Sequence, residues 1–185
     1  ILNTGDLERA DIIKSQEIKD LATAIGSLPG DTDISNLRYG KICILADADS
    51  DGLHIATLLC ALFLRHYKNL VTSGKIFVSM PPLYRIDAAK EVFYALDENE
   101  KESIVKKIKK QNSKIKIDIQ RFKGLGEMNP SQLRETVMKP ESRRLVQLTL
   151  SSSDNANSVF DLLLSKKRAP DRKEWLEKKG NLAEI

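Results

Sequence analysis

Hydrophobic residues recur at helical spacing in three parts of the chain. The apolar positions of residues 14–26 fall on one face of a helix that Gly26 would end. Residues 53–71 show the same spacing and predict a second helix. Residues 98–112 are expected to form a third helix, and another should begin near Pro130, because proline is favoured in the first turn.

Short apolar or alternating runs between these segments predict strands. KICILA (41–46) is typical of a strand buried on both faces, and KIFVSM (75–80) is a second run of this kind. The helix between them supplies the length that a crossover between parallel strands requires. EVFYALD (91–97) and IKIDIQRF (115–122) alternate as half-buried strands do, whereas PPLYRID (81–87) is expected to turn.

This order of elements predicts an α/β fold with an open, mostly parallel sheet flanked by helices. The chain from Ser142 onward looks helical and basic, so a smaller, mainly helical tail is expected after the sheet. We place the two domains at residues 1–117 and 118–185. In open sheets of this type, ligands bind outside the carboxyl ends of the strands.

The charge is distributed unevenly along the chain. Residues 1–100 carry 10 Lys or Arg against 15 Asp or Glu, a net −5, and residues 101–185 carry 20 against 11, a net +9. This charge pattern suits the binding of a polyanion. The basic part would hold the polyanion while metal ions in the acidic part contact its phosphates. A solvated lysine-rich surface would give the same totals.

Other features of the composition predict an intracellular protein. No apolar stretch approaches the roughly 20 residues that span a bilayer, so a cytoplasmic location without membrane association is expected. Cys43 and Cys60 lie in apolar runs without metal-ligand spacing. We therefore expect both to be reduced core residues.

Three aspartates follow directly on the first strand-like run. In ILADADSDGLH (44–54), Asp47, Asp49 and Asp51 occupy alternate positions before Gly52. They repel one another, and desolvating them would be unfavourable without compensation, which a divalent cation supplies most simply. Carboxylates suit Mg²⁺, and one or two ions held there could neutralise and polarise a phosphodiester.

The acidic loop has three alternative interpretations. A calcium-binding EF-hand needs a glutamate where Leu58 stands and a helix, not a strand, before the loop. A haloacid-dehalogenase-like phosphotransferase also places Asp-x-Asp after a buried strand, but no second acidic dipeptide of the expected kind follows Asp51. Simple helix capping by Ser50 or Asp51 would explain one aspartate rather than three.

Four motifs in series carry a family resemblance: DADSDGLHI (47–55), PPLYRI (81–86), RFKGLGEMN (121–129) and ESRRLVQLTL (141–150). With them the chain resembles the B subunit of bacterial type IIA topoisomerases, specifically a TOPRIM domain lacking its beginning, followed by the C-terminal tail. The amino-acid sequence of residues 45–63 resembles the topoisomerase IV branch more closely than the gyrase branch. The short path from Asp51 to Lys123 also leaves no room for the large insert of some gyrases.

The resemblance implies a part of an enzyme for ATP-dependent double-strand DNA cleavage, passage and religation, which decatenates chromosomes and relaxes supercoils. Its cofactor would be Mg²⁺, with Mn²⁺ or Ca²⁺ able to substitute in binding. The attacking tyrosine would belong to the topoisomerase IV A subunit in an A2B2 heterotetramer on chromosomal DNA, so none of this chain's tyrosines is expected to be the nucleophile. ATP would bind in an N-terminal domain outside this sequence.

The same resemblance assigns expected roles. Asp47 and Asp49 match the family's catalytic metal ligands, and Asp51 is a third carboxylate for the metal. The family's upstream EGDSA glutamate is absent, so the isolated chain is expected to be inactive. We expect three residues to face DNA: Lys123, His54 and Arg121. Arg143 and Arg144 are weaker candidates. A non-catalytic module that only binds DNA or a partner is the alternative.

Overall fold

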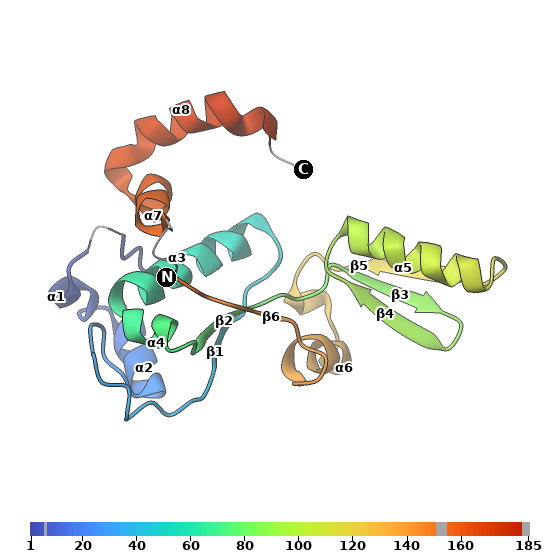
Figure 1. Ribbon diagram of the computed structural model, residues 1–185, viewed down its shortest axis with the longest axis horizontal. Helices are drawn as coiled ribbons and strands as arrows, with labels where there is room; N and C mark the ends of the chain where they lie inside the picture. The colour runs from blue at the N-terminus through green and yellow to red at the C-terminus, as the bar shows by residue number, and fades with distance from the viewer. Residues whose placement is uncertain (6, 151–154, 183–185) are drawn as a thin grey trace. The chain divides into compact units, whose positions relative to one another are not determined.

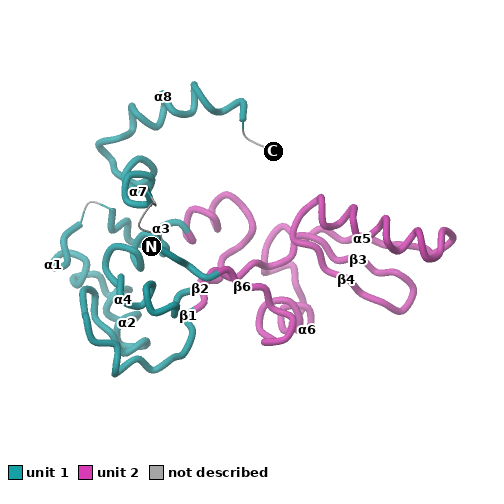
Figure 2. The backbone as a smooth tube through the Cα atoms, viewed as in Figure 1, with its two compact units in different colours: residues 1–42, 57–76, 147–185 teal, residues 43–56, 77–146 magenta. Residues whose placement is uncertain are grey.

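The computed structural model describes residues 1–5, 7–150 and 155–182 and shows a mixed α/β protein (Figure 1). The chain forms two compact units, one of residues 1–42, 57–76 and 147–185 and the other of residues 43–56 and 77–146 (Figure 2). The predicted α/β class is confirmed. The predicted division at 117/118 stays a prediction, and it falls within a strand of the second unit.

Helices dominate the first unit. Its α-helices and short helical turns are α1 (Arg9–Ile12), α2 (Gln16–Ile25), α4 (Lys68–Thr72), α7 (Ala156–Leu164), η3 (Lys166–Arg168), α8 (Ala169–Lys179) and η4 (Gly180–Leu182), together with most of α3 (Ser50–His66). Helix α2 ends at Gly26, as predicted, because glycine adopts the left-handed conformation there (φ 78°) without steric cost.

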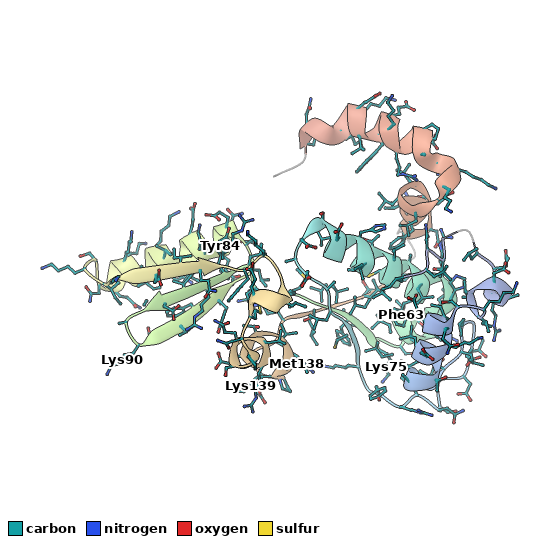
Figure 3. The ribbon with its side chains drawn as sticks, turned by 180° about the vertical axis from the view of Figure 1, so that it is seen from behind. Phe63, Lys75, Tyr84, Lys90, Met138 and Lys139 are labelled. Carbon is teal, nitrogen blue, oxygen red and sulfur yellow. The ribbon has the colours of Figure 1, made fainter. Side chains whose placement is uncertain are left out.

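The helix predicted over residues 53–71 is interrupted between α3 and α4. Tyr67 lies between them with non-helical backbone angles, and its side chain is buried. Its ring lies 5.5 Å, centroid to centroid, from that of Phe63, which Figure 3 labels on α3. Apolar positions recur on both sides of the break because each helix buries apolar residues, among them Phe63 of α3 and Leu70 and Val71 of α4.

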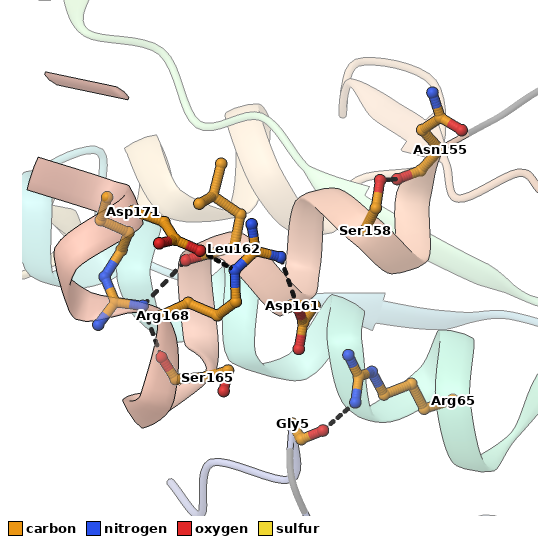
Figure 4. Close-up of polar contacts among 10 residues, drawn as sticks. Gly5, Arg65, Asn155, Ser158, Asp161, Leu162, Ser165, Arg168 and Asp171 are labelled. Atoms are coloured by element: carbon orange, nitrogen blue, oxygen red, sulfur yellow. Dashed lines mark hydrogen bonds and ion pairs between the residues drawn. The ribbon is translucent and has the colours of Figure 1, made fainter. Parts of the chain in front are cut away.

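The tail is anchored to the first unit through α7. Leu164 packs against Leu58 and Ala61 of α3. In Figure 4, Arg168 lies between Asp161, at 2.8 Å, and Asp171, and thereby links α7 to α8. The expected helical tail is thus confirmed from Ala156 onward.

No helix in the described part of the chain has both the length and the apolar character to cross a bilayer.

A small mixed sheet has the strand order β1-β2-β6, with β1 (Ile42–Ile44), β2 (Ile76–Ser79) and β6 (Leu145–Gln147). Strands β2 and β6 are antiparallel, since Leu148 N–H donates to the Ile76 carbonyl and Met80 N–H to the Arg144 carbonyl. β6 corrects the expectation that the chain is helical from residue 142. It is too short for its alternation to be recognised.

Strand β1 is less buried than its apolar sequence predicts. Ile44 is buried, but Cys43 is exposed and Ile42 only half-buried. The expectation of a core cysteine at position 43 is therefore wrong, because β1 is an edge strand of its sheet. Cys60, on α3, is half-buried, and burial raises the pKa of its thiol.

The second unit contains an antiparallel sheet of order β4-β3-β5, packed against α5 (Glu98–Gln111). Its strands are β3 (Tyr84–Ala88), β4 (Glu91–Ala95) and β5 (Ile117–Arg121). Ile86, Ala88, Ala95 and Ile108 form the core between the sheet and the helix, and Figure 1 shows α5 running along the sheet.

The central strand β3 corrects the prediction of a turn at residues 81–87. Ala88 pairs with Glu91, so Ala89 and Lys90 form a two-residue hairpin loop. Such loops usually carry Asn or Gly because they need a positive φ, but here Ala89 adopts φ 55°. The sequence therefore lacked the usual hairpin signal.

After β5 the chain forms three short helical segments. They are η1 (Leu125–Glu127), α6 (Pro130–Leu133) and a π-helical turn, η2 (Arg134–Met138). The predicted start near Pro130 is confirmed, and Asn129 caps it by accepting the Gln132 N–H while the Gln132 side chain accepts the Asn129 N–H. Met138 and Lys139, labelled in Figure 3, follow this capped turn.

One ion pair makes the second unit sensitive to acid. Arg144 donates to Glu100 at 2.8 and 2.7 Å, and Glu100 also accepts the Leu96 N–H at 2.7 Å. The hydrogen bonds from Arg144 are the main reason that the pKa of Glu100 is lowered. The pair therefore stabilises the fold above the ordinary carboxyl pKa, and this contribution is lost as pH falls through the lower folded-state value.

We accordingly expect the melting temperature to fall more steeply from about pH 5 to pH 3 in the unmodified protein than in an Arg144→Ala variant. Differential scanning calorimetry across this range measures both slopes. Arg143→Ala is the matched control, since Arg143 takes part in no ion pair among the described residues and should keep the original slope. Equal slopes for the unmodified and Arg144→Ala proteins would contradict the assignment.

Candidate functional site

The acidic loop lies between β1 and the first turn of α3. Asp49 caps this helix, because its Oδ1 accepts the Gly52 N–H at 2.7 Å and its carbonyl accepts the Leu53 N–H at 3.0 Å. The capping interpretation is thus correct for one aspartate, although the cap is neither Ser50 nor Asp51. The segment before the loop is a strand, which an EF-hand does not have.

Gly52 lets the loop fold tightly back on itself. A Cβ at this position would lie 2.1 Å from the Asp47 carbonyl oxygen and 2.7 Å from its carbonyl carbon. No side chain fits so close to backbone atoms. The glycine after the third aspartate is therefore required by packing against Asp47.

Asp47 contacts the glycine-bearing loop of residues 123–128, hereafter the glycine loop. Its Oδ1 accepts the Leu125 N–H at 2.7 Å, across 78 positions of sequence. A Cβ on Gly124 would lie 3.1 Å from the Asp47 Cγ. The acidic motif and the RFKGLGEMN motif, recognised separately in the sequence, therefore meet in one place within the second unit.

The three aspartates are exposed to solvent. Water can relieve their mutual repulsion, so desolvation does not force a cation into the loop, contrary to the argument from sequence. Within residues 1–5, 7–150 and 155–182, no three His, Cys, Asp or Glu side chains gather closely enough to form a metal site by themselves. Any cation bound here would need ligands from water or from a bound phosphate.

This open arrangement fits Mg²⁺. Mg²⁺ keeps several waters and is commonly held by one or two carboxylates together with substrate phosphates. The Oδ1 atoms of Asp47 and Asp49 each accept one backbone N–H, and a second oxygen remains on each carboxylate. The donor set therefore suits a cation shared with an anionic substrate better than a fully enclosed structural ion.

The residues expected to face DNA lie in different surroundings. His54 is exposed in the first turns of α3, and Lys123 is exposed at the start of the glycine loop. Within the described chain the Lys123 side chain has no ion pair, while its N–H donates to the Glu127 carboxylate at 2.8 Å. Lys123 is therefore exposed on the loop that contacts Asp47.

Two of the arginine candidates, Arg121 and Arg144, are less free. Arg121, at the end of β5, is exposed but close enough to Glu98 and Tyr84 to influence the pKa of both groups. Arg144 is engaged by Glu100. Lys123 thus lies on the glycine loop, which contacts the acidic loop. Arg121 instead interacts with Tyr84 of the antiparallel sheet and Glu98 of α5.

A mainly apolar cavity of about 230 Å³ adjoins the acidic loop. Its wall includes Asp47 and Gly52 from the loop and Met80 and Pro81 from the segment after β2. Sequence reasoning did not find this cavity, because it arises from the way two separate segments pack. The nearest signal was the apolar run that ends at Met80.

Comparison with known proteins gives consistent matches. The family model described as the carboxyl terminus of the DNA gyrase B subunit matches residues 114–177. The B subunit of DNA topoisomerase 4 from Pseudomonas aeruginosa is 59% identical over 185 residues, which is 100% of this chain and 29% of that protein. The B subunit of DNA gyrase from Thermotoga maritima is 40% identical over 179 residues, covering 96% of this chain and 27% of the relative.

A solved structure supports the fold. The DNA-binding, cleavage and re-ligation domain of Plasmodium falciparum topoisomerase II matches with a TM-score of 0.72 at 22% identity, over 95% of this chain and 24% of that chain. The chain spans less than a third of the length of the curated relatives that it matches. The chain belongs to the family of bacterial type IIA topoisomerase B subunits, on its topoisomerase IV branch, and corresponds to a C-terminal region of such a protein.

Proposed function

We propose that this chain is the part of a topoisomerase IV B subunit that holds Mg²⁺ at the DNA cleavage site. The contact between Asp47 and the glycine loop carries the proposal, because it unites exposed carboxylates with a loop bearing an available lysine. The relatives named above are topoisomerase IV and gyrase B subunits. Cleavage-complex formation by the reconstituted enzyme, with Asp47 or Asp49 substituted, tests it.

Asp47 and Asp49 would hold the metal, and Asp51 would bind a second ion or orient a metal-bound water. Mg²⁺ bound there would neutralise the scissile phosphodiester and stabilise its leaving oxygen. Asp49 also fixes the start of α3, so that its carboxylate is held at a defined position. Mn²⁺ or Ca²⁺ would occupy the same oxygens. His54, on the exposed first turns of the helix, would contact a phosphate.

Three of the chain's four tyrosines have raised pKa values. Burial raises the pKa of Tyr67 to about 12. Tyr84 donates to Glu98 at 2.7 Å, and this hydrogen bond is the main reason that its pKa is raised. Tyr94 is partly buried, which raises its pKa, and it donates to Glu135. A raised pKa disfavours the phenolate of these three tyrosines. The family resemblance implies that the attacking tyrosine belongs to the A subunit, and we assign it there.

The whole assembly would be an A2B2 heterotetramer acting on chromosomal DNA in the cytoplasm. It would cleave, pass and religate double-stranded DNA, decatenating chromosomes and relaxing supercoils, with ATP bound in another domain of the B subunit. Within that protein the β1-β2-β6 sheet would be part of a larger, mostly parallel TOPRIM sheet. β1 lies at the edge of the sheet with Cys43 exposed, which leaves room for a further strand.

Lys123 provides a test of the DNA contact. Lys123→Ala in the complete B subunit, assembled with the A subunit, should weaken DNA binding similarly for all sequences and lower the slope of log K against log salt by about 1. Fluorescence anisotropy over a salt series measures this slope. Lys90→Ala is the control, because Lys90 is an exposed lysine on the β3–β4 loop (Figure 3). An unchanged slope for Lys123→Ala would argue against a phosphate contact.

A further inference from the structure

The glycine loop touches the acidic loop through its backbone. The Leu125 N–H donates to Asp47 Oδ1 at 2.7 Å. Hydrogen bonds to an ionised oxygen are among the stronger ones in proteins, so this contact fixes the orientation of the carboxylate. One oxygen of Asp47 is thereby engaged, and the other is left for a different partner.

Gly124 makes the approach possible. A Cβ there would lie 3.1 Å from Asp47 Cγ and 3.2 and 3.3 Å from its two oxygens, closer than ordinary van der Waals contact. The backbone of Gly124 is extended (φ −161°), which any residue can adopt. These three nearest atoms all belong to the Asp47 carboxylate, so a side chain at position 124 would press on that group. Gly126, two positions later, has open space around it.

The glycine loop is itself held firmly. Lys123 N–H donates to the Glu127 carboxylate at 2.8 Å, and Glu127 N–H donates to the Gly124 carbonyl at 3.2 Å. Phe122, directly before the loop, and Met128, its last residue, are buried. A loop fixed at both ends can set the position of a side chain that it contacts.

From these contacts we infer that the glycine loop positions a metal ligand, with Gly124 and the Leu125 amide holding Asp47 so that its free oxygen faces the cation. Gly124 and Leu125 are positioning residues and do not touch the substrate. The inference rests on the proposed function of Asp47. It assigns to the backbone of this loop a role in metal binding, separate from the contact of Lys123 with DNA.

Two substitutions separate the backbone contacts from folding. Gly124→Ala adds a methyl group against the carboxylate, and Gly126→Ala is its matched control. Leu125→Pro removes the N–H at the first position of η1, where proline is tolerated, and the extended conformation of Gly124 suits a residue before proline. Leu125→Ala keeps the N–H and controls for the lost side chain.

The experiment uses the complete B subunit without DNA and measures Mn²⁺ binding through the electron paramagnetic resonance of the free ion. Gly124→Ala and Leu125→Pro should each raise the dissociation constant for Mn²⁺ by about 10-fold or more, whereas both controls should match the unmodified protein. In the reconstituted enzyme, the Mg²⁺ concentration for half-maximal DNA cleavage should rise in parallel. DNA affinity in EDTA should not change.

Three results would be decisive in the other direction. If Asp47→Asn weakens Mn²⁺ binding while Gly124→Ala and Leu125→Pro behave like their controls, the positioning role is wrong and the metal site stands. If Asp47→Asn leaves Mn²⁺ binding unchanged, the proposed function itself fails. Loss of DNA affinity in EDTA, without a change in Mn²⁺ binding, would show that the glycine loop acts on DNA alone.

Discussion

Asp47→Asn and Asp49→Asn should each reduce Mg²⁺-dependent DNA cleavage by the reconstituted heterotetramer by about 100-fold or more. A bound cation contributes several kcal/mol of charge stabilisation, and each 1.36 kcal/mol corresponds to a factor of about ten in rate. Asparagine keeps an Oδ1 acceptor, so the hydrogen bonds from Leu125 to residue 47 and from Gly52 to residue 49 can persist. The substitution therefore removes the charge and leaves the loop folded.

Gel quantification of covalent DNA–protein complexes, over a Mg²⁺ series, measures this effect. The melting temperature of the B subunit and its association with the A subunit should be unchanged. Asp118→Asn is a suitable control, because Asp118 is an exposed carboxylate on β5 that should leave cleavage intact. Cleavage at the unmodified rate by both loop variants would mean that the chain acts as a binding module only.

Gly52→Ala should have the second largest effect, on both stability and cleavage. The added Cβ would lie 2.1 Å from the Asp47 carbonyl oxygen, so the backbone between β1 and α3 must move. Overpacking of this kind costs about 1 to 3 kcal/mol and can cost more when backbone atoms are involved. The displaced loop would also separate Asp47 from the Leu125 N–H.

Thermal unfolding of the variant should show a melting temperature lower by about 2 to 12 °C, together with loss of Mg²⁺-dependent cleavage. Gly40→Ala, at a position with no atoms within 4 Å of the new Cβ, should leave both unchanged. A Gly52→Ala protein with unaltered stability and cleavage would show that the tight loop is not needed.

Local sequence signals predicted local structure well. Gly26 marked the end of α2, and the spacing of apolar residues gave α5 almost to its ends. The strand, acidic loop and helix at residues 42–66 were also recognised. Here the chain changes within a few positions from a continuous apolar run, through aspartates and a glycine, to apolar residues at helical spacing. These features depend on neighbouring residues alone.

Features that depend on distant residues were not predictable. The exposure of Cys43 follows from the position of β1 at a sheet edge, and no nearby residue signals it. β3 was misread because Ala89 adopts a positive φ that its side chain does not favour. The contact of Asp47 with Leu125 joins two motifs through a backbone N–H, which every residue except proline carries.

The site shows the same division. The motifs identified the carboxylates and the glycine loop. Only the contacts show the different roles of two aspartates: Asp49 caps α3, and Asp47 accepts a hydrogen bond from the glycine loop. Family resemblance supplied the expected roles of Lys123 and His54. Both side chains are exposed, as a contact with DNA requires.

The most direct test of the account locates the cation. Crystals of the reconstituted heterotetramer with DNA and Mn²⁺ can be measured at the manganese absorption edge, where anomalous scattering marks the ion. We expect a peak within coordination distance of the free oxygen of Asp47 or Asp49 and of a phosphate oxygen of the DNA. A well-ordered Mn²⁺ at the scissile phosphate with no ligand from either aspartate, directly or through water, would contradict it.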